Sequence, residues 1–467
     1  MAETSTTTGF TREALAEIVS KKGAGPSLQA GGATAWSPDG QRVAVDGVRT
    51  LAFEQFEAMP MPSPETEEWR YTDLRDLDLT PFIPYAEEPS AANLDDVRPE
   101  ILGAAGAVGE RSGLAIQHNS SVITAHLDPA EASKGVLFQS VDEALRQHSS
   151  GLESHLHKAV APWRSKFSAL HAAFRTGGTF VHVPDGVHVE LPLQTLTYVD
   201  RDRLAVFPHT IIVLGEGAEL TFIDRYVSRD LEGVLSDAAV ELYLGTGSKL
   251  RYVSLQDWGR GVTHLSVQNA VIAPDAELRS LVVAFGGSLS RTEVESVMQG
   301  DGGSSEMLGL YFADEDQHFD FRSIQNHLGS RTASDLLYKG ALKGRSRAVY
   351  TGTVIIQRDA HKCDAYQTNR NILLSETAKA HTVPNLEILT NDPVRCGHAA
   401  SVGPVDEDTM FYIQSRGIPY EEAERLVVFG FFQEVLDRVT LPEVRQGLEQ
   451  AIADELEKKD DEAGHAA

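Results

Sequence analysis

The sequence predicts a mainly β protein in which short strands stack into a solenoid, with an α/β region before it and a helical region after it. Three observations predict this class. Val, Ile, Thr, Tyr and Leu alternate with polar residues from about residue 179 to 403, a weak repeat runs through that stretch, and helical periodicity appears on both sides. A chain of 467 residues is long enough for such a core with two flanking domains.

The amino-terminal part divides into two segments. Residues 1–47 are rich in Thr, Ser, Gly and Ala, so we expect a flexible arm. Residues 48–165 are predicted to form a small helical or α/β domain, in which an apolar pattern around Phe53 indicates a short amphipathic helix. Trp69 offers a large apolar anchor, and a further helix is expected over 141–161.

The repeat lies in residues 166–403, the predicted solenoid core. Each copy has an apolar residue that closes a strand, a small or polar turn, and a small residue before the next strand. Several copies are close to thirty residues apart, which suits a coil of a solenoid better than a hairpin. A β-sandwich with similar turns is the alternative. The copies are LGEGAEL at 214–220, LGTGSKL at 244–250, IAPDAEL at 272–278, LKGRSRA at 342–348 and LSETAKA at 374–380.

Residues 404–467 are predicted to be a helical domain with an acidic tail. Apolar residues recur at three and four spacing over 406–416 and 420–438, and Pro442 opens a third helix that runs over 443–460. From the residues alone, this domain is either a cap over the end of the solenoid or a docking domain for a partner.

Composition excludes several classes of function. The net charge of -27, from 68 acidic and 41 basic residues, argues against binding to nucleic acid or to an anionic membrane through a basic surface. No phosphate-binding glycine motif is present, so no nucleotide hydrolysis is expected. The sequence has no secretory signal at its start and no apolar run of roughly 20 residues, and two cysteines cannot form a disulfide framework. We therefore expect a cytoplasmic protein with reduced thiols.

An acidic cluster, DEDQHFD at 314–320, supports one enzymatic alternative. Asp316 and Asp320 could act as paired carboxylates, as in a β-helix enzyme that acts on polysaccharides. Because such enzymes are mostly exported, a solvated turn is the preferred interpretation.

Each cysteine has a histidine two residues away. His361 precedes Cys363, and His398 follows Cys396. Residues i and i+2 of a strand share a face, so each thiol would be presented with an imidazole. No CxxC or HxxxH spacing occurs, so a closed metal site is not expected, and any site would be open or shared with another chain.

The two cysteines are predicted to differ in exposure. The interval from Cys363 to Cys396 is 33 residues, about one inferred coil, so their strands could be neighbours. Cys363 is expected to be a small core residue, with no assigned role beyond that of an accessory thiol. Cys396 and His398 lie between the turn NDP and the small-residue run AASVG, where exposure at a strand end is expected.

Longer motifs identify a family resemblance. The run KGRSRAVYTGTVIIQRDAHKCDAYQTNRNILLSETAKAHTVPNLEI (343–388), then CGHAASVG (396–403) and FYIQSRGI (411–418), resembles the SufB/SufD family of iron–sulfur cluster assembly proteins. The segments EEWRYTDL (67–74) and FVHVPDGVHVELPLQ (180–194) are similar to the SufD branch, and the longer cysteine-bearing amino-terminal segment of SufB is missing.

The resemblance implies a right-handed parallel β-helix between two helical domains. It implies a non-catalytic scaffold that pairs with a SufB-like paralogue through the β-helix and binds a SufC-like ATPase through the carboxyl-terminal helices. A transient iron–sulfur cluster would form at the shared interface, with His398, beside Cys396, as the matching ligand position. No permanently bound cofactor is expected. The further alternative is a SufB-like scaffold that pairs with itself, and a homodimer is possible for the isolated chain.

Overall fold

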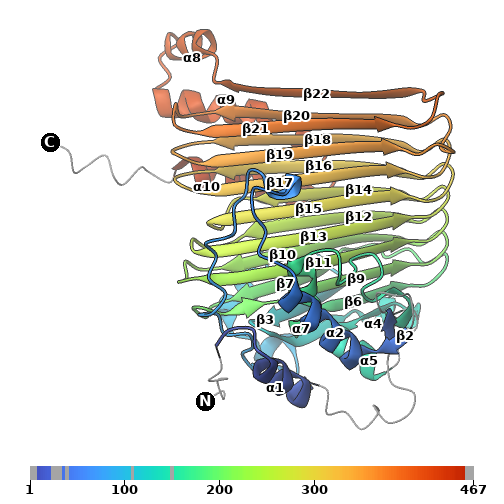
Figure 1. Cartoon of the computed structure of the whole chain (residues 1–467). Coiled ribbons are helices and arrows are strands. Elements are labelled where there is room, and N and C mark those ends of the chain that lie inside the picture. The colour runs from blue at the N-terminus through green and yellow to red at the C-terminus, as the bar shows by residue number, and fades with distance from the viewer. Residues whose placement is uncertain (1–7, 23–33, 37–41, 107–109, 148–151, 458–467) are drawn as a thin grey trace.

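A computed structural model describes residues 8–22, 34–36, 42–106, 110–147 and 152–457. Two long sheets lie face to face, and the chain passes from one to the other at each turn of a solenoid (Figure 1). The first sheet runs in the order β22 (Arg395–Pro404), β20 (Asp364–Leu373), β18 (Ala333–Leu342), β16 (Ser304–Ala313), β14 (Glu277–Ala284), β12 (Lys249–Asp257), β10 (Glu219–Ser228), β7 (Leu193–Val199), β3 (Gly113–His118) and β4 (Ser121–Leu127).

The second sheet faces the first across the interior of the solenoid. Its order is β21 (Lys379–Ile388), β19 (Arg347–Ile356), β17 (His318–His327), β15 (Leu289–Met298), β13 (Val262–Ile272), β11 (Val234–Leu244), β9 (His209–Leu214), β6 (Thr179–Val183) and β5 (Leu137–Ser140). Short β8 (Ala205–Val206) also pairs with β11, and β1 (Thr34–Trp36) and β2 (Arg42–Ala44) form a separate hairpin.

The predicted repeat marks the corners of the coils. Leu214, Leu244 and Ile272 close successive strands of the second sheet and share one buried core with the small corner residues Ala218 and Ala276. The copies at 342–348 and 374–380 stand at the opposite corners, where the first sheet leads into the second. Strands within the coils pair in parallel with the strand two places along, so the solenoid is confirmed and the β-sandwich alternative is wrong.

Helices of the amino-terminal region cover the outer face of the second sheet. α1 (Arg12–Lys22) buries Leu15 and Ile18 against α2 (Val45–Ala58) and α7 (Lys166–Phe174). The flexible arm expected over residues 1–47 is therefore wrong for α1, whose apolar face finds a partner on the distant α7. Other parts of that arm, 1–7, 23–33 and 37–41, lie outside the described residues.

The sheets begin earlier than residue 166, where we expected the solenoid to start. β3 pairs in parallel with β7, and β5 pairs antiparallel with β6, so strands of the amino-terminal region extend both sheets. The expected helix over 141–161 is two short helices, α5 (Val141–Arg146) and α6 (Leu152–His155). The remaining short elements are η1 (Glu67–Trp69), η2 (Leu94–Asp96), α3 (Pro99–Ala104) and α4 (Pro129–Ser133).

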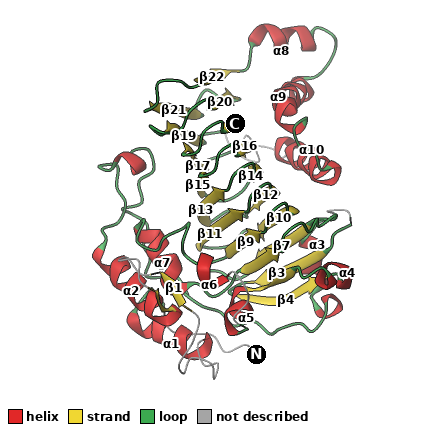
Figure 2. Cartoon of the chain, turned by 90° about the vertical axis from the view of Figure 1, so that its right-hand side faces the viewer, coloured by secondary structure: helices red, strands yellow, loops and turns green. Residues whose placement is uncertain are grey.

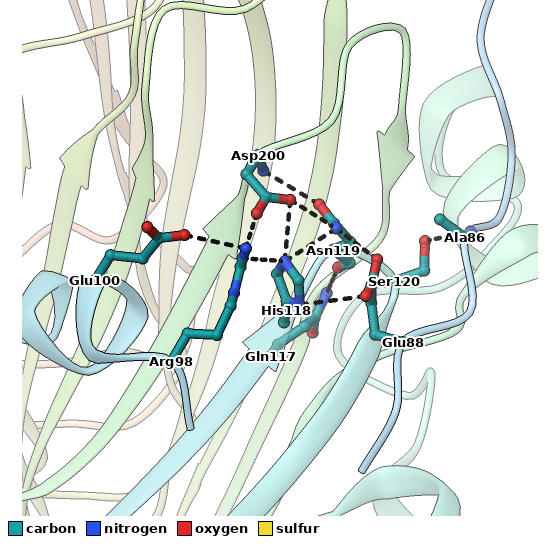
Figure 3. Close-up of polar contacts among 9 residues, drawn as sticks. All are labelled: Ala86, Glu88, Arg98, Glu100, Gln117, His118, Asn119, Ser120 and Asp200. Atoms are coloured by element: carbon teal, nitrogen blue, oxygen red, sulfur yellow. Dashed lines mark hydrogen bonds and ion pairs between the residues drawn. The ribbon is translucent and has the colours of Figure 1, made fainter. Parts of the chain in front are cut away.

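A polar network joins this region to the first coils (Figure 3). The carboxylate of Asp200, just after β7, pairs with the guanidinium of Arg98, accepts from Asn119 Nδ2 at 3.0 Å and lies 3.0 Å from His118 Nε2. Burial alone would raise the pKa of Asp200. The hydrogen bonds outweigh burial and hold this pKa well below 3.8. Asn119 also donates to Glu88 at 2.8 Å. The network is an anchor between segments far apart in the sequence.

A long segment, residues 59–85, crosses the outer face of the second sheet, and we call it the strap (Figure 1). The guanidinium of Arg291 on β15 lies 3.9 Å from the centre of the Trp69 ring. Thr72 Oγ1 donates to Asp320 Oδ2 at 2.7 Å and lies 2.9 Å from His318 Nε2, both on β17. The predicted anchor Trp69 thus fixes the strap to β15, and its ring also lies 6.2 Å from the ring of Phe167 on α7.

The carboxyl-terminal helices are α8 (Glu407–Gln414), α9 (Tyr420–Leu436) and α10 (Pro442–Glu457). α9 and α10 pack on the outer face of the first sheet, where Phe432 and Ile452 join one apolar core with Leu310 and Leu337 (Figure 2). These helices therefore cover a side of the solenoid, and of the two alternatives for this domain, the cap over the end of the solenoid is wrong. The acidic tail from residue 458 lies outside the described residues. Among the residues described, no helix combines the length and apolarity needed to cross a membrane.

Candidate functional site

The solenoid ends in two strands that each have a neighbour on one side only. β21 closes the second sheet and β22 closes the first. Apolar side chains are exposed around them, with Val394 65%, Leu389 55%, Ile388 41% and Val402 40% exposed. Unpaired strand edges with apolar side chains are a template for pairing with another chain. We call this surface, formed by β21, β22 and the turn between them, the open end.

Cys396 and His398 lie on β22 and point to the same side. Cys396 is in register with Ala365 of β20, and His398 is in register with Gln367. Ala365 and Gln367 are 0% and 1% exposed, so they face the interior of the solenoid. The thiol and imidazole therefore continue the interior face into the last coil, and His398 is exposed because no further strand covers it.

The Cys396 thiol is half-buried against the last apolar cluster of the core. It packs on Cys363 and Ala365. Burial, with a smaller effect of the neighbouring Cys363, raises the pKa of Cys396 above its usual value. The free thiol is therefore not activated as a nucleophile, although coordination to iron would remove its proton.

The other Cys and His pair is not presented as the sequence predicted. His361 and Cys363 lie in the turn before β20, not in a strand, and Lys362 between them has a φ of 57°. Cys363 is fully buried and accepts a hydrogen bond from Thr332 Oγ1 at 3.2 Å. His361 is exposed instead, with Nδ1 2.9 Å from a carboxylate oxygen of Asp392. The two side chains point apart because a turn, unlike a strand, does not alternate faces.

The predicted stacking of the two cysteine segments is confirmed. β20 and β22 are parallel neighbours, and the backbone N–H of Val394 donates to the carbonyl of Cys363 at 2.8 Å. An interval of about one coil therefore brought Cys363 next to Cys396 in space.

Sequence reasoning missed two residues, one on β20 beneath the open end and one on the open end itself. Gln367 lies directly under His398 in register, and its Oε1 has no hydrogen-bond partner among the described residues. Its position 31 residues before His398, one coil back, was the signal that could have found it. The second is His381 on β21, against which Tyr71 of the strap stacks. No sequence signal connects residues so far apart.

The acidic cluster does not form a pair of carboxylates on one surface. Asp320 is buried on β17 beneath the strap and pairs with Arg291, whereas Asp316 is exposed in the preceding corner and pairs with Arg345. The expected solvated turn holds for Asp316 and is wrong for Asp320. This arrangement removes the specific support that the cluster gave to a polysaccharide-active enzyme.

The chemistry available at the open end is that of an incomplete ligand set. One thiol and one imidazole share a strand face, and soft metal or iron–sulfur chemistry uses these two ligand types. Two ligands are too few to hold a metal centre tightly, so further ligands would have to come from a chain that covers the open end.

Comparison with known proteins agrees with this architecture. The family model for the SufBD core domain, described as SUF system FeS cluster assembly, matches residues 197–431, and the model for the SufBD N-terminal region matches residues 110–195. An iron–sulfur cluster assembly SufBD family protein of Mycobacterium tuberculosis is 38% identical over 283 residues, in an alignment that covers 56% of this chain and 71% of that protein.

Two Bacillus subtilis proteins match over a greater length. Its iron–sulfur cluster assembly protein SufD is 28% identical over 409 residues, 87% of this chain and 92% of that protein. Its SufB is also 28% identical, over 399 residues, 82% of this chain and 83% of that protein. With a core-domain match over half of its length and these relatives along most of it, this chain belongs to the SufB/SufD family of SUF-system iron–sulfur cluster assembly proteins.

Proposed function

We propose that this chain is a SufD-type scaffold subunit that pairs with a SufB-like paralogue through its open end and docks a SufC-like ATPase through α8–α10. A nascent iron–sulfur cluster would form at the shared interface as cargo, with His398 and Cys396 as the ligands from this chain. The observation that carries the proposal is the exposed imidazole of His398 beside the thiol of Cys396 on an unpaired terminal strand.

The ligand types suit a cluster that must be released. A neutral imidazole and a single thiolate hold a cluster more loosely than four thiolates, and a site completed by two chains opens when the chains move apart. Reduced cysteines fit a cytoplasmic setting. Nothing in this assignment requires the chain to catalyse a reaction itself, because the ATPase activity would belong to the partner.

The docking role of the carboxyl-terminal helices is supported by their surface. Phe411 is 73% exposed and Tyr412 59% exposed on α8, and Tyr420 and Leu426 on α9 are 55% and 46% exposed. Large exposed aromatic residues are frequent in protein interfaces. α8 also stands away from the sheets (Figure 1), so its aromatic face is free to meet a partner.

A second candidate is a SufB-like scaffold that pairs with itself. This candidate is supported by the chain's equal identity to the SufB and the SufD of Bacillus subtilis. The open end of one copy could meet the open end of another about a two-fold axis. In that case the isolated chain would assemble a cluster without a paralogue.

The test is cluster assembly on the complex. The chain is co-expressed with SufB-like and SufC-like partners, and iron and acid-labile sulfide are measured per complex for wild type and His398→Ala. We expect His398→Ala to lower both contents while leaving the size of the complex unchanged, because an exposed ligand contributes little to packing. The matched control is His361→Ala, an exposed histidine of the adjacent coil, which should keep wild-type contents.

Two results would contradict the SufD-type assignment or the role of His398. Equal iron and sulfide in His398→Ala and wild type would remove His398 from the site. Stoichiometric iron and sulfide on the isolated chain would favour the self-paired scaffold over the SufD-type subunit.

A further inference from the structure

A second group of metal-binding side chains lies far from the open end, where the amino-terminal segment meets β9 and β11. At its centre is Glu241 on β11, which is 0% exposed. Its carboxylate accepts from the backbone N–H groups of His157 at 2.7 Å, Ala159 at 2.7 Å and Val160 at 3.2 Å, and from the Tyr243 hydroxyl at 2.8 Å. Four donors therefore converge on this one buried side chain.

Two imidazoles form a row that ends at this carboxylate. His171 Nδ1 lies 2.8 Å from the backbone carbonyl oxygen of Asp237, and His171 Nε2 lies 3.2 Å from His209 Nδ1. His209 Nε2 lies 2.9 Å from Glu241 Oε1. Both histidines are buried, at 2% and 0% exposed.

The hydrogen atoms in this row can be assigned from its fixed end. A carbonyl oxygen only accepts, so His171 Nδ1 carries a hydrogen, and a neutral His171 then presents a lone pair at Nε2. His209 must therefore donate from Nδ1, and a neutral His209 presents its own lone pair at Nε2 to the carboxylate of Glu241. Two acceptors 2.9 Å apart repel each other, so either a proton or a metal ion must lie between them.

A divalent metal ion bound between these two acceptors would remove the repulsion, because an imidazole nitrogen and a carboxylate oxygen are both ligands that such ions accept.

His157 supplies a third ligand. Its backbone has a φ of 60°, in the left-handed region, and its side chain is 4% exposed. The centres of its ring and the His209 ring are 5.1 Å apart, and no described residue forms a hydrogen bond with the His157 ring. Ligand atoms of His157, His209 and Glu241 all lie within 4.8 Å of one another. Two imidazoles and one carboxylate are a common ligand set for Zn²⁺ and for non-haem Fe²⁺.

We propose that His157, His209 and Glu241 bind a divalent transition-metal ion that ties the segment before α7 to the first coils of the solenoid. His171 is a positioning residue, because its hydrogen bond fixes the tautomer in which His209 Nε2 faces the ion. Since all three ligands are buried, the ion enters during folding and stabilises the folded state. This site stands several coils from His398 and does not depend on the function proposed for the open end.

The first test is metal content. The full chain is unfolded in guanidinium with a chelator, refolded with Zn²⁺, freed of loose metal and analysed by mass spectrometry. We expect about one tightly held zinc per chain, and substoichiometric zinc in His157→Asn. Asn adopts the left-handed backbone readily, so this variant keeps the turn while losing the ligand. His264→Gln, a buried histidine bonded to Ser236 outside the cluster, is the control and should retain the zinc.

The second test does not depend on a variant that folds. Wild type refolded with Co²⁺ should show the visible absorption of cobalt bound by nitrogen and oxygen ligands and a Tm several degrees above that of chain refolded without metal. His398→Ala should give the same spectrum. Wild type that refolds with Zn²⁺ or Co²⁺ present yet retains neither would overturn the proposal, and so would full zinc retention by His157→Asn. In both cases a hydrogen bond, and not a metal ion, would join His209 to Glu241.

Discussion

The ring of Tyr71 stacks on the imidazole of His381, with the ring centres 5.0 Å apart and the planes 17° apart. Tyr71 belongs to the strap, and His381 lies on β21, the terminal strand of the second sheet. The strap therefore carries the amino-terminal region to the edge on which we propose pairing. A partner that covers the open end would meet the strap as well as β21 and β22.

Thr72 holds the strap to β17, and its loss should free the strap. Thr72→Val removes the hydrogen bond to Asp320 and the contact with His318. We expect a loss of about 1–2 kcal/mol in the free energy of unfolding and faster cleavage within residues 59–80 in limited proteolysis. Thr66→Val is the control, because the Thr66 hydroxyl donates to the carbonyl of the nearby Ser63 and not to a strand of the solenoid among the described residues. Equal cleavage of the two variants would mean that Thr72 does not secure the strap.

Docking of the ATPase should depend on the exposed aromatic face of α8. Phe411→Ser should weaken binding of the SufC-like partner at least tenfold, about 1.4 kcal/mol, without changing the Tm, because Phe411 is 73% exposed. Leu389→Ser at the open end should leave this affinity unchanged. Titration calorimetry compares the three proteins, and wild-type affinity in Phe411→Ser would place the dock elsewhere.

The open end should drive self-association when no partner is present. Its unpaired strand edges and exposed apolar side chains predict a dimer whose population rises with concentration in sedimentation velocity. Val402→Lys adds a charge to that surface and should shift the chain to monomer. Leu328→Lys is the control, because Leu328 has a similar exposure of 39% but lies at a corner of an inner coil. This variant should leave the population of dimer unchanged. Dimers that persist in Val402→Lys would point to another interface.

One carboxyl inside the solenoid should make stability depend on pH. Asp224 Oδ2 accepts from Thr210, Tyr226 and Tyr252, while Oδ1 has no partner among the described residues. Burial raises the pKa of Asp224 to about 6. The folded state thus binds this proton more tightly than the unfolded chain, and the stability that protonation gives is lost as pH rises from about 4 to 6.

Asp224→Asn removes this titration. Relative to the variant, wild type should lose about 3 kcal/mol of unfolding free energy between pH 4 and pH 7, about two pKa units. Chemical denaturation at several pH values measures the difference. Asp316→Asn is the control: its exposed carboxyl pairs with Arg345, which holds its pKa below 3.8, so any effect should have the opposite sign. A pH-independent difference between wild type and Asp224→Asn would contradict the prediction.

The sequence by itself determined the regular parts of the molecule. Alternation and the repeat predicted the coils, and helical periodicity predicted α8, α9 and α10 close to their observed bounds. The spacing of Cys396 and His398 predicted a shared strand face, which β22 has. These features depend on neighbours along the chain or exactly one coil away, and such neighbours leave a periodic signal.

Only the tertiary structure decided which surfaces meet. Periodicity shows that α9 and α10 have an apolar face, but not that the face packs on the side of the first sheet. The same holds for the strap contact of Tyr71 with His381 and for the turn that separates His361 from Cys363. Contacts between distant segments depend on the shape of both surfaces, and packing shape leaves no period in the sequence.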